Sequence, residues 1–116
     1  MRLKSGLWVS AYVRRVGLAG AFAAVVKRGD SSAGAIFIKI NRLDGTVDLF
    51  APALMLGQGD RNDRLWELRN KRASEPDVDQ YLTREQGRDQ DMWVVEVESR
   101  SGAHFLAPEE IVVQPA

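Results

Sequence analysis

The chain has 116 residues and carries sixteen Lys and Arg against sixteen Asp and Glu, with no cysteine. A chain of this length buries about two-thirds of its unfolded surface in one core, and its 45% hydrophobic and 28% charged residues are typical of a globular protein. This composition excludes intrinsic disorder, and the lack of cysteine excludes disulfides, thiolate zinc sites, iron–sulfur clusters and cysteine nucleophiles. We therefore expect a single domain over residues 1–116.

The charge is unevenly distributed along the chain, although its sum is zero. Residues 1–42 hold eight Lys and Arg against Asp30 alone, and residues 43–116 hold eight Lys and Arg against fifteen acids. Two interpretations stay open. The two halves pair through surface ion pairs, each of which contributes little to stability, or the basic half forms a binding face.

The apolar segments of the chain are short. Ser10, Tyr12, Arg14 and Arg15 interrupt the segment after the basic N-terminus, which therefore differs from the apolar core of a signal peptide. Nowhere do about 18 consecutive apolar residues occur, the length that a membrane-spanning helix requires. We expect a cytoplasmic protein that has no membrane partner.

The first predicted element is a helix over residues 5–17. The following apolar residues have the spacing of one helical face: Trp8, Val9, Tyr12, Val13 and Val16. Ser5 is a candidate N-cap, and the helix dipole favours Arg14 and Arg15 near the C-terminus. A strand is the alternative, because residues 7–13 also alternate and include good strand formers.

Three strands are expected next, over residues 21–27, 33–40 and 46–50. Turn-forming residues at 28–32 separate the first two strands. Asp44 and Gly45, a strong signal for a tight turn, separate the second from the third. Because each connection is too short for a crossover, we predict that these strands form an antiparallel meander.

The second half contains a long loop, two or three strands and a second helix. Residues 51–63 are predicted to form the loop, and residues 64–69 an antiparallel strand with one solvent-facing side. Ser74, Pro76 and Asp77 are typical of a helix start, and we expect this helix to end near Gly87. Residues 92–98 form a strand that turns back into a short partner over 103–106, followed by a helical turn at Pro108. Together the elements predict an α+β fold of two layers, with two main helices on a mostly antiparallel sheet of five to six strands.

Several segments, taken in order, resemble a known family. They are residues 8–11 with Arg14 and Arg15, residues 28–30 with 33–36, residues 41–45, and residues 93–98. This pattern covers nearly the whole chain and is similar to a family of small alphaproteobacterial proteins classed as a domain of unknown function. The resemblance implies a bacterial, cytoplasmic, stand-alone domain, and it implies no activity, cofactor or catalytic residue.

A candidate binding surface lies in the basic half. Its members are Trp8, Tyr12, Arg14, Arg15, Lys27 and Arg28. Aromatic rings beside cationic side chains can stack on the bases of single-stranded nucleic acid and bind its phosphates. The alternative is that the aromatic residues anchor the core, and the aromatic pattern of known RNA-binding motifs is missing.

Carboxylates provide the other candidate site. Glu96 and Glu98 project from the same face of one predicted strand, and Glu67 faces them if its strand is a neighbour, which is the geometry of paired acid and base groups. Alternating acids are more often the solvent face of a strand, paired with basic residues across the sheet. His104 is the single histidine, so we expect neither a metal site nor a cofactor. A carboxylate-only site for Mg²⁺ or Ca²⁺ would draw on Asp60, Asp63 and Asp91, but these residues lack the spacing of a calcium-binding loop.

Three functions remain open. The first is a non-catalytic binding or protein-interaction module whose polarised charge docks a protein partner or a second copy of the chain. The second is single-stranded nucleic-acid binding through the basic N-terminal half. The third is an enzyme of carboxylate chemistry, with the 51–63 loop as its lid. We favour the first, because the sequence contains no catalytic constellation.

Overall fold

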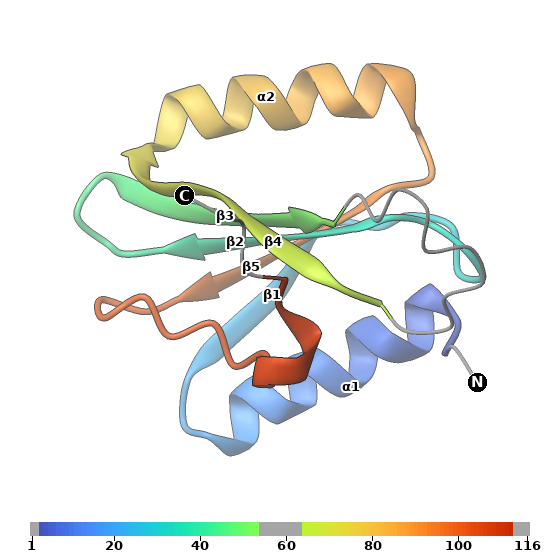
Figure 1. The fold of residues 1–116 in the computed structure, drawn as a ribbon, viewed down its shortest axis with the longest axis horizontal. Helices are drawn as coiled ribbons and strands as arrows, with labels where there is room; N and C mark the ends of the chain where they lie inside the picture. Colours follow the sequence, from blue (N-terminus) through green and yellow to red (C-terminus); the bar gives the residue numbers. More distant parts are fainter. Residues whose placement is uncertain (1–2, 54–63, 113–116) are drawn as a thin grey trace.

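Two helices lie on opposite faces of a five-stranded mixed sheet in the part of the chain that the computed structural model describes, residues 3–53 and 64–112 (Figure 1). The elements follow the chain as α1 (Ser5–Leu18), β1 (Phe22–Lys27), β2 (Ile36–Asn41), β3 (Thr46–Pro52), β4 (Trp66–Ser74), α2 (Glu75–Arg88), β5 (Trp93–Glu98) and the 3-10 turn η1 (Pro108–Glu110). The α+β class, the two main helices and the mostly antiparallel sheet are confirmed, and the one parallel pair is β2 with β5. Most of the loop predicted at 51–63 lies outside the described residues. Neither described helix is long and apolar enough to cross a membrane.

Both predicted helices are confirmed, with one difference at the start of α1. Ser5 is not the N-cap, because Lys4 holds that position without a side-chain hydrogen bond. Ser5 is instead fully buried, and its Oγ donates to the Gly34 carbonyl at 2.6 Å. Ser74 does cap α2, since its Oγ accepts from the Asp77 N–H at 3.3 Å.

The strand order is β1-β5-β2-β3-β4, so the predicted meander is only partly present. β2 and β3 form the expected hairpin, and the strand predicted at 64–69 is present as β4, which begins two residues later at Trp66 and pairs antiparallel with β3. The pairing of β1 with β2 is wrong, because β5 lies between them, antiparallel to β1 and parallel to β2. The connection at 28–35 passes over the start of β5, where Gly29 and Gly34 approach so closely that a Cβ on either would overlap the Asp91 carbonyl oxygen.

The prediction of two layers is wrong in its layer count, because the sheet has a helix on each face. Ile36, Ile38 and Ile40 of β2 lie in a core cluster with α1, whereas Phe37 lies in a second cluster with α2. A strand buried on both sides requires cover on both sides, which gives three layers. In Figure 1, α2 covers β3 and β4 on one side while α1 lies on the other.

The segment after β5 contains no strand at residues 103–106, so the predicted short partner is wrong. Phe105 has a φ of 61°, which a strand does not accommodate. Its neighbours are held by α1 instead: the Tyr12 hydroxyl donates to the His104 carbonyl, and Arg15 Nη1 donates to the Phe105 carbonyl at 2.7 Å. The helical turn expected at Pro108 is confirmed as η1.

Candidate functional site

The two aromatic members of the predicted binding surface belong to the core. Trp8 is 7% exposed and Tyr12 is fully buried, and their rings stack with centroids 5.0 Å apart. Trp8 also contacts Trp66, at 4.5 Å between ring centroids. These positions face the sheet because they lie on the apolar stripe of α1. Neither ring offers a face to a nucleotide base, which corrects the expectation of a stacking platform.

Two of the four basic members hold neighbouring segments of the chain in place. Arg15, which donates to the Phe105 carbonyl, also donates to Glu110 Oε1 at 3.1 Å. Lys27 Nζ donates to the carbonyls of Gln90 and Met92 at 2.8 and 2.9 Å. Their charged groups therefore fix the tail and the start of β5 as well as adding to the surface charge.

The remaining two basic members, Arg14 and Arg28, line a groove between α1 and β1 with a volume of about 620 Å³. Leu7 and Val25 add exposed apolar surface along it. The Arg28 guanidinium lies 5.3 Å from the centre of the Trp93 ring, a cation–π distance. The structure thus brings Arg14 and Arg28 together beside an apolar surface.

β1 is an edge strand, and its exposed side chains are mostly apolar. Its outer edge has no neighbouring strand among the described residues, and α2 packs against β3 and β4 rather than over β1. Phe22 is 58% exposed, Val25 40% and Val26 61%, and Leu18 just before the strand is 78% exposed. Edge strands are usually protected by charges or proline. Here the single charged side chain of the strand, Lys27, is bonded to carbonyls of the chain itself.

Sequence reasoning missed this apolar edge because it placed residues 21–27 beside β2, in the interior of a meander. The available signal was the composition of Ala21–Val26, which contains no polar side chain. Such a run is expected of a strand covered on both faces. In this fold, with β1 at the edge, the same run leaves apolar side chains exposed.

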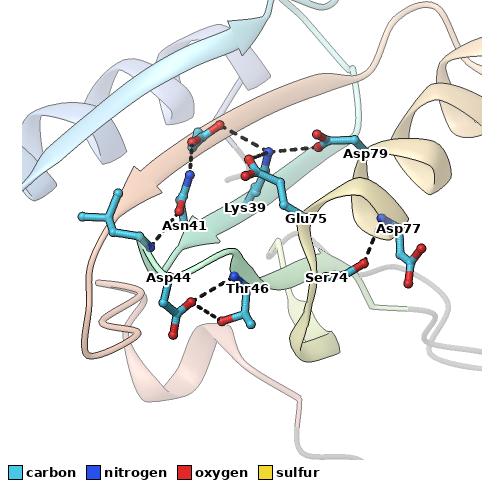
Figure 2. A network of polar contacts seen from close by, with 10 residues as sticks. Lys39, Asn41, Asp44, Thr46, Ser74, Glu75, Asp77 and Asp79 are labelled. Carbon is cyan, nitrogen blue, oxygen red and sulfur yellow. Dashed lines mark hydrogen bonds and ion pairs between the residues drawn. The ribbon is translucent and has the colours of Figure 1, made fainter.

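The carboxylates proposed as an acid–base pair do not meet. Glu67 on β4 and Glu96 on β5 are separated by β2 and β3, and Glu98 is exposed to solvent. Glu96 instead belongs to a cluster around Lys39, where it accepts from Asn41 Nδ2 at 3.0 Å (Figure 2). Among residues 3–53 and 64–112, no three acidic or histidine side chains are placed to hold a metal, and Asp60 and Asp63 lie outside these ranges.

Lys39 is a buried cation surrounded by carboxylates. Its Nζ lies 2.7 Å from Glu75, 2.9 Å from Asp79 and 3.6 Å from Glu96, and Figure 2 shows it reaching from the sheet to the start of α2. Burial alone would lower the pKa of Lys39, but the hydrogen bonds to Glu75 and Asp79 and the charge of Glu96 raise it. The ammonium stays charged and ties α2 to the sheet, which is a structural role.

The geometry defines a small three-layer α+β domain with an apolar edge strand and a basic groove beside it. The chain belongs to the family described as protein of unknown function DUF1491, whose model matches residues 3–107. No curated protein matches the chain.

Three solved structures illustrate the family relationship. The crystal structure of a DUF1491 family protein from Caulobacter crescentus CB15 is 40% identical, with 99% of this chain and 100% of that chain covered and a TM-score of 0.78. The NMR structure of a DUF1491 family protein from the same organism is 42% identical, with 99% of each chain covered and a TM-score of 0.79. The solution structure of protein Atu0922 from A. tumefaciens is 40% identical, with 99% and 98% coverage and a TM-score of 0.82.

Proposed function

We propose that the protein is a non-catalytic protein-interaction module that binds an extended segment of a partner protein along the free edge of β1. The observation that carries the proposal is the run of exposed apolar side chains on an edge strand, Phe22, Val25 and Val26, together with exposed Leu18 at the end of α1. An added strand would pair with the outer backbone groups of β1, which face no strand among the described residues, while its alternate side chains cover the apolar ones.

The charge beside the edge defines the chemistry of the partner segment. Arg14 and Arg28 line the groove that Val25 also lines, so a segment paired with β1 has both guanidinium groups within reach. Arginine binds carboxylates with two parallel hydrogen bonds. We therefore expect the partner segment to be extended, apolar at alternate positions and acidic at its flank.

A selection from a random peptide display library against the full chain tests this function. The expected result is enrichment of peptides that alternate apolar residues and carry Asp or Glu to one side. Upon titration of a selected peptide, amide shifts in the NMR spectrum should change along β1 and the facing side of α1. A selection that enriches no such pattern, or shifts confined to another face, would overturn the proposal.

Two variants and a matched control make the test specific. Phe22→Lys and Val26→Lys place charges on the edge and should each weaken a selected peptide at least about tenfold, because a partner strand would bury the ammonium. The control, Leu68→Lys, changes an exposed apolar side chain on the opposite edge strand, β4, and should bind as the parent does. Equal loss in all three would contradict an interface at β1.

Single-stranded nucleic acid is an alternative outcome of the same experiment. In that case an oligothymidylate would compete with the peptide, its affinity would fall steeply with salt, and Arg14→Glu would abolish its binding. This result would make nucleic acid the preferred ligand in place of the peptide. The burial of Trp8 and Tyr12 disfavours this outcome, since stacking would have to come from other residues.

A further inference from the structure

A second cleft lies on the α1 side of the sheet, away from the β1 edge, and has a volume of about 570 Å³. β3 and β4 contribute one wall, and the segment after β5 contributes the other; Figure 1 shows this segment on the same side of the sheet as α1. The lining is mixed. Its apolar members are Phe50, Leu68, Ile111 and Val112, and its polar members are Arg42, Asp48, Lys71, Ser101 and His104.

A buried ion pair forms the back of the cleft. Arg42 Nε and Nη2 donate to the two carboxylate oxygens of Asp48 at 3.0 and 2.7 Å, and both side chains are almost fully buried. Asp48 Oδ1 also accepts from the Arg72 N–H at 2.8 Å. Burial alone would raise the pKa of Asp48, but the hydrogen bonds from Arg42 and Arg72 lower it, so the carboxylate stays ionised. The pair is internally neutral, and the positive charge of Lys71 is left at the cleft.

The backbone around the cleft is held in a conformation that L residues seldom adopt. The described non-glycine residues with positive φ are Leu43 (63°), Arg72 (49°) and Phe105 (61°). Each directly follows a polar residue of the cleft, and Gly102, at φ 79°, follows a fourth. For the three non-glycine residues such a conformation is unfavourable by about 1–3 kcal/mol each, and strained residues of this kind cluster at ligand sites, where they aim side chains. Here they coincide with four convergent polar groups: Arg42, Lys71, Ser101 and His104.

His104 presents a hydrogen-bond donor to the cleft side of the sheet. Its Nδ1 accepts from the Leu106 N–H at 3.0 Å, so the proton of the neutral ring lies on Nε2. Its carbonyl is held by the Tyr12 hydroxyl, and the next carbonyl by Arg15. Tyr12 and Arg15, both members of the predicted nucleic-acid surface, therefore position the wall of this cleft.

We propose that this cleft binds a small organic carboxylate with an apolar or aromatic body. The carboxylate is recognised by the Lys71 ammonium together with the donors of Ser101 and His104, and the body packs against Leu68 and Ile111. A monoanion would balance the positive charge of Lys71, which forms no ion pair with an acid among the described residues, whereas a neutral molecule of the same shape would not. The volume lies within the range of small-molecule sites, about 300–1,000 Å³. This site is independent of the β1 edge, and neither proposal depends on the other.

An NMR titration of the ¹⁵N-labelled full chain with benzoate tests the site. We expect saturable amide shifts at Ser101, Gly102 and Leu106, with a Kd of about 1–10 mM for a ligand of this size. Benzyl alcohol, which has the same ring without the charge, should bind at least about fivefold more weakly. Equal affinity for the two compounds, or shifts that do not saturate or lie elsewhere, would overturn the proposal.

A matched pair of lysine variants distinguishes recognition of the carboxylate by Lys71 from a general effect of the protein's positive charge. Lys71→Met should weaken benzoate binding about three- to fivefold and leave the affinity for benzyl alcohol unchanged. Because Lys71 is exposed, this variant is expected to fold. Lys4→Met removes the same charge from an exposed position outside the cleft and should bind benzoate as the parent does. An unchanged benzoate affinity in Lys71→Met, or the same loss in Lys4→Met, would refute the assignment.

Discussion

Gly102 has no side chain and so leaves room for the Arg42 guanidinium that pairs with Asp48. The stability cost of an alanine at Gly102 can be compared with that of an alanine at Gly45, which has no such neighbour. Both glycines have positive φ, 79° and 87°. A Cβ at Gly45 would have no described heavy atom within 4 Å, whereas a Cβ at Gly102 would overlap Arg42 Nη2 and lie 2.6 Å from Cζ. Gly45→Ala therefore isolates the conformational penalty, about 1–2 kcal/mol. Gly102→Ala carries the same penalty and also displaces the guanidinium from Asp48.

Urea denaturation followed by circular dichroism distinguishes the two variants. With an m-value of about 1.5 kcal/mol/M, the conformational penalty lowers the midpoint for Gly45→Ala by about 0.7–1.3 M. Inserting a methyl group into a packed site adds about 1–3 kcal/mol, so Gly102→Ala should lose at least about 0.7 M more. Equal midpoints at unchanged m would show that the guanidinium moves aside freely, and would refute the view of the pair as a fixed wall of the cleft.

Three further substitutions test the contacts around the sheet. Burial lowers the pKa of His104 below 6.5, the usual value of a histidine, and the charge of Asp48 opposes this with a smaller effect. As the pH falls below 6.5, His104 therefore binds a proton more readily in the unfolded chain than in the folded protein. The free energy of unfolding should decline on acidification below that value, and His104→Gln should remove this part of the decline in parallel urea titrations; an unchanged slope would contradict it. Ser74→Ala should destabilise the protein by about 1 kcal/mol in the same assay, since it removes the N-cap of α2. Tyr12→Phe should destabilise it by about 0.5–1.5 kcal/mol and speed hydrogen exchange at the Leu106 amide, because the His104 carbonyl loses its donor.

The elements that sequence alone predicts are those whose signals are local. The start of α2 depends on Ser74 and the acids of the first turn, which lie within four residues of one another. The β2–β3 hairpin depends on Asp44 and Gly45: the carboxylate accepts from the Thr46 N–H at 2.9 Å, and the glycine supplies a φ of 87°. Each signal acts through its own neighbours, so it can be identified without knowledge of the rest of the fold.

The strand order could not be predicted in this way, because it depends on a contact more than fifty residues apart. Residues 28–35 have a length that suits a hairpin, and nothing within them specifies a strand inserted from the end of the chain. The deciding contact is between Gly29 and Gly34 and the Asp91 carbonyl, which leaves room for β5 between β1 and β2. Glycines at a close backbone approach look the same in sequence as glycines in a turn.

The same distinction between local signals and contacts of distant residues applies to the candidate sites. The spacing that predicts α1 as a helix also assigns Trp8 and Tyr12 to its buried stripe, so the helix prediction is incompatible with a stacking surface formed by these two rings. The cleft combines residues from four separate segments, and no spacing rule connects Arg42, Lys71, Ser101 and His104. The single histidine, His104, draws attention in the sequence, but only the fold shows which residues lie next to it.

Although the net charge of the chain is zero, the basic residues of its first half lie in two different environments. Arg15, Lys39 and Arg42 from the basic half pair with acids of the other half, and the last two do so in buried positions. Arg14 and Arg28 instead lie in the groove beside β1, with no ion pair to a described acid. Salt screens exposed charges more strongly than buried pairs. Raising the ionic strength should therefore weaken the binding of an acidic partner at the β1 edge while leaving the stability of the fold nearly unchanged.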